Sequence, residues 1–214
     1  MKFTLSILAL LAIAFLVGCS AKDTRDNKLS NSEITKLGKK YGGVYVFNKK
    51  FEKEIDDRER ERQELSQELG NKIRSNPRKI KNGNEYIIIY DIDMTPVDQK
   101  LPQTLSNGKK YYTSTRSYEQ DYKKAVNVSK KYINEVINFI GQEDYNKFKP
   151  SIDIGYFYVD NDEIVPIELS ATYSYQGTKF GLFGDEGRGF ALSRDEIRYT
   201  KGGNRFYLED LERR

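Results

Sequence analysis

The chain has 214 residues, with one cysteine, no histidine and no tryptophan. The absence of histidine excludes Ser-His-Asp and Cys-His catalysis and histidine-ligated zinc, and a single cysteine excludes an intramolecular disulfide. The formal net charge is +4, which is too small to indicate a nucleic-acid partner. Hydrophobic residues make up only 37% of the chain, so we expect a thin core to which the 16 tyrosines add ring surface.

Residues 1–18 have the pattern of an export signal. A charged start, with Lys2, precedes an apolar stretch from Leu5 to Val17. That stretch is too short for an ordinary membrane-spanning helix, and small residues follow it, as is typical of a secretory signal.

The signal ends in Leu16-Val17-Gly18-Cys19, which resembles the lipobox of bacterial lipoproteins. The resemblance implies cleavage between Gly18 and Cys19 and attachment of diacylglyceryl and palmitate-type chains to Cys19. It places the mature protein in the bacterial cell envelope as a membrane-anchored lipoprotein, and Ser20 after the cysteine favours the outer membrane in a Gram-negative host. The alternatives are an ordinary secretory signal with an incidental cysteine and an uncleaved anchor.

Residues 19–32 are short and polar, so we expect a lipidated tether followed by a single α+β domain over residues 33–214. Ser30 and Glu33 have capping-box spacing, which predicts a helix from about Asn31 to Tyr41. Residues 44–47 are either a brief strand or the lead-in to the next helix.

A charged segment at residues 49–75 predicts an exposed helix, because opposite charges recur four positions apart. Its apolar stripe is interrupted in the middle, where Arg58 and Arg62 bridge the gap. This pattern favours a helix that docks at both ends and is solvated between them. A coiled-coil partner is the alternative, and Asn76-Pro77 should end the helix.

The run Tyr86-Ile87-Ile88-Ile89-Tyr90 is apolar and β-branched, which predicts a buried strand that continues to about Ile92 or Met94. Residues 95–109 read as a loop, and residues 110–116 are expected to pair back onto this strand. A 3.6-residue apolar period from about 117 to 140 predicts one long amphipathic helix.

The C-terminal third alternates between apolar and polar residues, most clearly over residues 165–175, where Glu168 falls on the polar side. Asp160-Asn161-Asp162 has turn composition. Further strands are expected at 178–183, 188–193, 195–200 and 204–209. The predicted fold class is therefore α+β, with an antiparallel sheet mainly within residues 150–210, the long helix at 117–140 and the charged helix at 49–75.

Asp91-Ile92-Asp93-Met94-Thr95 follows the apolar strand and resembles the first motif of the haloacid dehalogenase phosphatases. The resemblance implies a Mg²⁺-dependent phosphatase with Asp91 as nucleophile and Asp93 as general acid and base. The fold of that family needs a parallel sheet, whereas the downstream chain alternates like an antiparallel one. The alternative interpretation is two exposed aspartates at a strand end.

No catalytic constellation, metal site or cofactor site is otherwise expected, so the sequence favours a non-enzymatic binding domain with a protein or cell-wall partner. One concrete hypothesis is an immunity or exclusion lipoprotein that neutralises an exported toxin. The candidate partner surface combines a tyrosine- and cation-rich stretch with a glycine-rich hairpin tip. Its residues are Tyr111, Tyr112, Arg116, Phe183 and Arg188.

Overall fold

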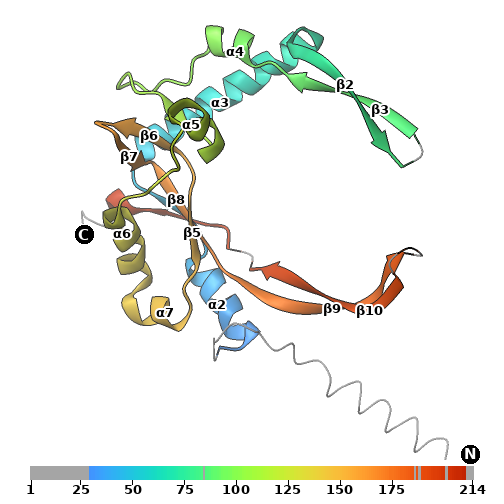
Figure 1. Ribbon diagram of the computed structural model, residues 1–214. Helices are drawn as coiled ribbons and strands as arrows, with labels where there is room; N and C mark the ends of the chain where they lie inside the picture. The colour runs from blue at the N-terminus through green and yellow to red at the C-terminus, as the bar shows by residue number, and fades with distance from the viewer. Residues whose placement is uncertain (1–28, 84, 186, 188, 201, 211–214) are drawn as a thin grey trace, which may run out of the picture. The chain divides into compact units, whose positions relative to one another are not determined.

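Helices and antiparallel strands both contribute to the computed structural model of the chain, which confirms the α+β class (Figure 1). The structure describes residues 29–83, 85–185, 187, 189–200 and 202–210. The signal at 1–18, Cys19 and most of the tether lie outside the described residues, so lipidation stays a prediction.

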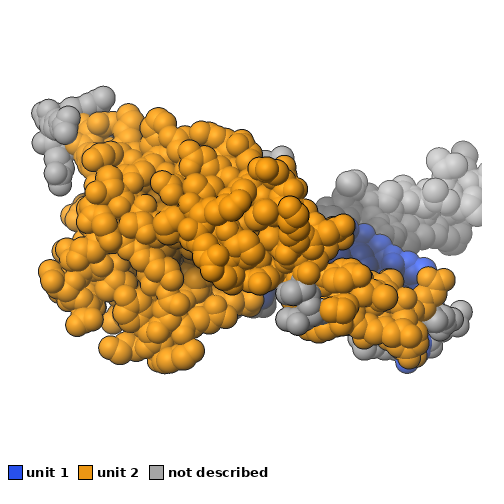
Figure 2. All heavy atoms as spheres, turned by 90° about the horizontal axis from the view of Figure 1, so that it is seen from above, with its two compact units in different colours: residues 1–43, 140–151, 171–204 blue, residues 44–139, 152–170, 205–214 orange. Residues whose placement is uncertain are grey.

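Two compact units divide the chain, and each is assembled from separate segments (Figure 2). Unit 1 comprises residues 1–43, 140–151 and 171–204, and unit 2 comprises residues 44–139, 152–170 and 205–214. The expectation of a single domain over residues 33–214 stays a prediction, and each unit is described by itself below.

Unit 1 contains helix α2 (Asn31–Tyr41), which has the predicted bounds. The Ser30 hydroxyl accepts the Glu33 N–H, and the Glu33 carboxylate accepts the Ser30 N–H at 2.8 Å, so the predicted capping box is present. The Tyr41 hydroxyl donates to Asp144 Oδ2 of helix α7 (Gln142–Lys147) at 2.7 Å. Strands β9 (Ser174–Asp185) and β10 (Gly189–Tyr199) form a long antiparallel hairpin.

Unit 2 holds the charged helix α3 (Lys49–Leu69), which continues into a 3-10 turn (Gly70–Ile73). Strands β2 (Arg74–Asn82) and β3 (Glu85–Ile92) form an antiparallel hairpin. A three-stranded sheet has the order β4-β6-β7, and a four-stranded sheet, most of whose residues belong to unit 2, has the order β11-β1-β8-β5. The remaining elements are β1 (Gly43–Val46), α4 (Thr95–Lys100), β4 (Tyr111–Tyr112), α5 (Thr115–Tyr122), α6 (Lys130–Ile140), β5 (Ser151–Ile154), β6 (Phe157–Asp160), β7 (Glu163–Pro166), β8 (Glu168–Thr172), β11 (Asn204–Tyr207) and a 3-10 turn (Leu208–Asp210).

Tyrosines form much of the core of unit 2. Tyr111 packs with Ile55, Leu105 and Ile167 in one buried cluster. Its neighbour Tyr112 belongs to a second cluster, where its ring stacks on Phe157 with centroids 5.3 Å apart. Tyrosine therefore supplies the apolar area that the composition lacks, and it lies deeper in the core than expected.

The predicted helix at 117–140 is wrong in its continuity, because α5 and α6 are separate helices. Helix α5 begins after Ser114, whose hydroxyl accepts the Ser117 N–H, and it ends at Lys123 in the left-handed conformation with φ 54°. The intervening segment includes Val126, Asn127 and Val128, which are weak helix formers. Both helices keep the 3.6-residue period, so periodicity alone did not reveal the break.

The strand at 86–92 exists, but its predicted burial and its predicted partner are both wrong. Strand β3 pairs with β2, not with residues 110–116, and Tyr111-Tyr112 instead pairs with Tyr158 and Phe157 of β6. The predicted helix over 49–75 ends early, since Gly70 has φ 49° and residues 74–82 are extended, with Pro77 next to a bulge. Residues 95–100, expected in a loop, form α4.

The prediction of antiparallel strands mainly within residues 150–210 is confirmed, but these strands belong to three sheets and not to one. The alternating segment 165–175 is divided among β7, β8 and the start of β9, while Gly177 lies inside the long hairpin instead of separating two strands. Strands β1 to β4 lie outside residues 150–210 altogether. The predicted turn at 160–162 is correct, because Asn161 and Asp162 have φ of 48° and 64° and connect β6 to β7.

Candidate functional site

The β9–β10 hairpin of unit 1 is a two-stranded ribbon (Figure 1). It carries large apolar side chains that are exposed to solvent. Four of these side chains lie in the half of the hairpin nearest the turn: Phe180 is 65% exposed, Leu182 70%, Phe190 61% and Leu192 78%. We call these four residues the apolar hairpin tip. Isolated two-stranded hairpins are marginally stable, and clustered exposed apolar residues mark interaction sites.

The apolar hairpin tip has side chains on both faces of the ribbon, and the pairing within it contains a bulge. Ser193 lies opposite Phe180 and Ala191 lies opposite Phe183, so two residues of β9 face only Leu192 in between. Phe180 shares the face of Ser193, whereas Leu192 and Phe190 are one and three positions from Ser193 and point to the other face. A two-stranded ribbon has no second layer on either face that could bury these side chains.

Charged groups of both signs lie nearer the base of the hairpin. Arg198 Nε is 3.2 Å from Glu196 Oε1, and the Thr178 hydroxyl donates to Asp195 Oδ1 at 2.9 Å. The Arg194 guanidinium lies 4.7 Å from the centroid of the half-buried Phe183 ring. These pairs leave little net charge on an exposed ribbon, so the arrangement suits contact with a partner.

Two of the five residues of the predicted partner surface are buried. Tyr111 and Tyr112 are 1% and 2% exposed, so they cannot contribute to a surface, which corrects that prediction. Burial, followed by hydrogen bonds to Glu59 and Asp121, raises the pKa of both hydroxyls. Arg116 is exposed on α5, Phe183 belongs to the hairpin, and Arg188 lies outside the described residues.

Asp91 and Asp93 do not fit the phosphatase motif, which corrects that alternative. Strand β3 lies in an antiparallel hairpin, whereas the resemblance requires a parallel sheet. Asp91 is paired with Arg78 at 2.6 Å. Asp93 accepts the Thr95 N–H at 3.0 Å, and hydrogen bonding from Thr95 lowers its pKa. Within the described residues no group of three or more acidic or cysteine side chains is placed to hold a metal ion.

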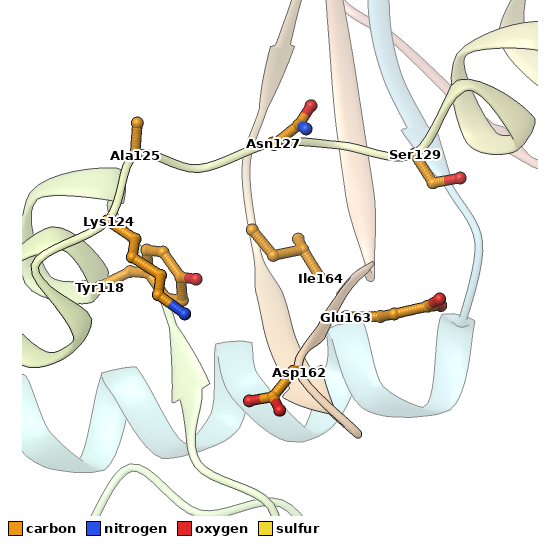
Figure 3. A pocket seen from close by; sticks show the side chains of 8 residues that line it. All are labelled: Tyr118, Lys124, Ala125, Asn127, Ser129, Asp162, Glu163 and Ile164. Carbon is orange, nitrogen blue, oxygen red and sulfur yellow. The ribbon is translucent and has the colours of Figure 1, made fainter.

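An open cleft in unit 2 lies between the segment after α5 and the β6–β7 turn (Figure 3). Its volume is about 330 Å³, at the lower end of the range for small-molecule sites. The charged side chains on its walls, Lys124, Asp162 and Glu163, are all exposed. Because these groups are hydrated, the cleft offers little desolvated surface for a ligand.

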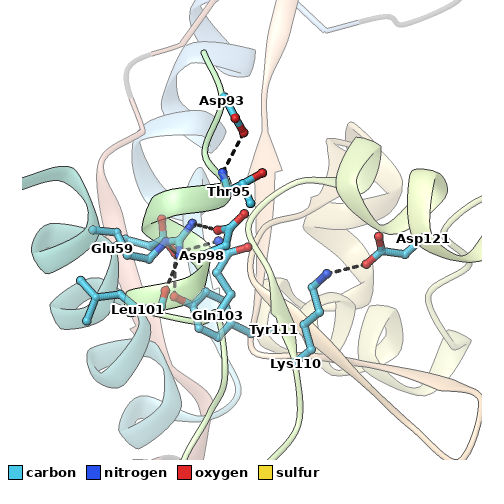
Figure 4. Close-up of polar contacts among 10 residues, drawn as sticks. Glu59, Asp93, Thr95, Asp98, Leu101, Gln103, Lys110, Tyr111 and Asp121 are labelled. Carbon is cyan, nitrogen blue, oxygen red and sulfur yellow. Dashed lines mark hydrogen bonds and ion pairs between the residues drawn. The ribbon is translucent and has the colours of Figure 1, made fainter. Parts of the chain in front are cut away.

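A buried polar network attaches the middle of α3 to its neighbours in unit 2 (Figure 4). Arg62 is 5% exposed, and its guanidinium binds Asp98 Oδ1 at 2.6 Å and the Leu101 carbonyl. Glu59 lies 3.3 Å from Arg62 Nε and accepts hydrogen bonds from the Tyr111 hydroxyl at 2.6 Å and from Gln103 at 2.8 Å. Arg62, which interrupts the apolar stripe of the sequence, thus attaches α3 to its neighbours. Its position within the stripe is the sequence feature that could have indicated this role.

Two further carboxylates of unit 2 are buried, although Glu168 falls on the polar side of the sequence pattern. Burial raises the pKa of both Glu52 and Glu168, and Arg205 counteracts this effect. Arg205 forms an ion pair with Glu52. A Cβ at Gly155 would lie 2.3 Å from Glu168 Oε1, so the absence of a side chain there makes room for this carboxylate. This cluster ties α3 to β8 and β11.

Comparison with known proteins gives no relative: no family model, no curated protein and no solved structure matches the chain. In the part of the chain that the structure describes, no helix is both long and apolar enough to cross a membrane.

Proposed function

We propose that the protein is a lipid-anchored lipoprotein of the bacterial cell envelope that binds a protein partner through the apolar hairpin tip and catalyses no reaction itself. The observation that carries this proposal is the exposure of Phe180, Leu182, Phe190 and Leu192 on a ribbon of two strands. The anchor rests on the lipobox resemblance at Leu16-Val17-Gly18-Cys19.

The chemistry of the hairpin favours a protein over the other envelope components. A bilayer is disfavoured because the sequence between Leu182 and Phe190 contains Asp185 and Glu186, and carboxylates are costly in hydrocarbon. A glycan is disfavoured because the tip is formed by phenylalanine and leucine, which cannot donate hydrogen bonds to hydroxyl groups. A protein groove lined by apolar residues with charges of both signs at its rim would match both the tip and the base.

An exported toxin is the concrete partner that the immunity hypothesis names, and a neighbouring toxin gene would support it. The apolar tip would then occlude a surface of the toxin at the membrane. In that case Leu192→Asp should abolish protection of cells that receive the toxin. Unchanged protection by Leu192→Asp, with the protein present in normal amount, would refute a role of the tip in immunity.

Photocrosslinking in the native envelope tests the proposal directly. A photoreactive residue replaces Leu192 in the full-length chain, and the matched control carries it at the exposed Glu64 of α3. We expect one predominant protein adduct from position 192 that disappears when Phe180→Asp is added, and no such adduct from position 64. Adducts to lipid alone, or the same products from both positions, would overturn the proposal.

The anchor has a separate test. Cys19→Ser should abolish both acylation and processing of the signal, and it should release the protein from the membrane fraction. Cleavage and membrane retention that are unchanged in Cys19→Ser would refute lipidation without affecting the hairpin proposal.

A further inference from the structure

The β2–β3 hairpin of unit 2 has a second set of exposed apolar residues, and these lie along one strand. In β3, Tyr86 is 61% exposed, Ile88 62%, Tyr90 47% and Ile92 57%. Ile87, which is 40% exposed, lies opposite Ile80 of β2 and points to the other face of the ribbon. Among the described residues β3 pairs with β2 alone, so its other edge carries unpaired backbone groups.

The two edges of this hairpin are differently protected. Strand β2 contains Pro77 and the cations Arg78, Lys79 and Lys81, which are residues that proteins use to block strand pairing. Strand β3 has no proline or cation over Glu85–Ile92, and its central five residues are all apolar or aromatic. The β3 edge is therefore the one open to strand addition.

The open edge is self-complementary, because Tyr86-Ile87-Ile88-Ile89-Tyr90 reads the same in both directions. In antiparallel pairing about a two-fold axis normal to the sheet, a residue must lie opposite its own copy. With Ile88 at the axis, Ile87 lies opposite Ile89 and Tyr86 lies opposite Tyr90. A centre at Ile87 would instead place Glu85 opposite Ile89, and a centre at Ile89 would place Asp91 opposite Ile87. Each of these registers puts a carboxylate opposite an isoleucine.

In the register centred on Ile88, Glu85 of one copy lies opposite Asp91 of the other at each end of the pairing. This like-charge pair is the one unfavourable contact of the register. That cost is reduced because Asp91 is already paired with Arg78 at 2.6 Å. On the face of Ile88, the lysines at 79 and 81 lie opposite Ile88 and Tyr86 across the hairpin, and Lys79 Nζ is 4.8 Å from the Tyr86 ring centroid. The joined sheet would therefore have an apolar middle bordered by cations.

We propose that β3 pairs antiparallel with β3 of a second copy of this chain, centred on Ile88, to form a four-stranded sheet in the order β2-β3-β3-β2. The proposal does not depend on the partner of the apolar hairpin tip. Four strands with shared apolar faces meet the requirement for stability that one hairpin does not. The isologous geometry closes after two copies, because each β3 has only one free edge.

Cysteine crosslinking of the detergent-extracted full chain tests the register. Opposed residues in antiparallel strands have Cα atoms about 4.5–5.5 Å apart, a separation that a disulfide spans. Ile88→Cys should form a disulfide dimer by itself. Tyr86→Cys and Tyr90→Cys should each fail alone and crosslink when the two variants are mixed. The unsubstituted chain, whose only cysteine is Cys19, serves as the control and should give no disulfide dimer.

Light scattering after size-exclusion chromatography tests the association itself. The wild-type chain should be dimeric, Ile88→Lys should weaken association at least tenfold, and Ile92→Lys should remain dimeric, since Ile92 is equally exposed but lies outside the self-complementary run. A monomeric wild type, or a dimer that Ile88→Lys leaves intact, would overturn the proposal. Crosslinks that form at position 88 but never between 86 and 90 would overturn the register.

Discussion

The core of unit 2 and the two hairpins use apolar residues in opposite ways. Tyr111 and Tyr112 lie in a polar stretch of sequence, yet they are almost fully buried. The far more apolar runs at 86–90 and 180–183 lie on two-stranded ribbons in solvent. The hydroxyls of these two tyrosines have carboxylate acceptors, Glu59 for Tyr111 and Asp121 for Tyr112. The comparison shows that apolar sequence is not the same as burial, and the exposed apolar residues of the hairpins are the observation on which both proposals rest.

The largest expected effect separates the core from the tip by stability. Tyr111→Ala should lower the free energy of unfolding by about 3–5 kcal/mol, because it leaves a cavity beside Ile55 and Ile167. Leu192→Ala should change the free energy of unfolding by less than about 0.5 kcal/mol, as is usual for exposed positions. Denaturant unfolding of both variants measures the difference. Equal losses of unfolding free energy in the two variants would show that Leu192 is packed, and the core and the hairpin tip would then not differ.

A second prediction compares two arginines of the same charged helix. Arg62→Ala should lower the free energy of unfolding by about 1.5–3 kcal/mol, because it removes the hydrogen bonds that the buried guanidinium donates to Asp98 and to the Leu101 carbonyl. Arg60→Ala should cost about 0.5 kcal/mol or less, since its side chain is 64% exposed and pairs with Asp57 in solvent. Thermal unfolding of the two variants checks this, and similar losses would mean that α3 does not dock through Arg62.

A smaller effect is expected from pH, and it distinguishes two kinds of carboxylate. The Tyr41 hydroxyl, and then Lys147, lower the pKa of Asp144 below its ordinary value of 3.8. The stabilisation from Asp144 is therefore present at neutral pH and is lost as pH falls below about 4 through the folded pKa. Glu52 and Glu168 behave in the opposite way, because their raised pKa values make folding more favourable as pH falls from neutrality toward 4.5.

Asp144→Asn isolates the first kind of carboxylate. Its free energy of unfolding should fall below that of the wild type at pH 7, and the difference should narrow as pH falls below about 3.8. Denaturant titrations at several pH values measure the difference. A gap that persists unchanged at pH 3 would show that the Asp144 charge does not contribute in this way.

Local signals predicted local structure well. The Ser30–Glu33 capping box gave the bounds of α2, the spaced charges indicated α3, and Asp160-Asn161-Asp162 gave the β6–β7 turn. These features depend on neighbours within four residues, so the sequence contains the information needed.

Long-range pairing could not be read in the same way. Hydropathy placed the Tyr86–Tyr90 run inside, but burial depends on whether another layer covers it, and a run of isoleucines looks the same in both cases. The partner of Tyr111-Tyr112 is a strand more than forty positions away. The docking role of Arg62 needed Asp98 and Leu101 to come close in space. A glycine-rich hairpin tip was anticipated as a partner contact, but through Phe183 and Arg188 and not through the four exposed residues of the apolar hairpin tip. The paired length of the hairpin was hidden by its internal glycines.

Cysteine accessibility tests the central claim, that the apolar hairpin tip is open in the free protein and covered in the envelope. Leu182→Cys is labelled with a membrane-impermeant maleimide, once in purified protein and once in envelope made accessible by mild lysis. Glu64→Cys is the control. We expect rapid labelling of both positions in the purified protein, and protection from labelling at position 182 alone in the envelope. Slow labelling of position 182 in the purified protein, or equal labelling in both preparations, would contradict it.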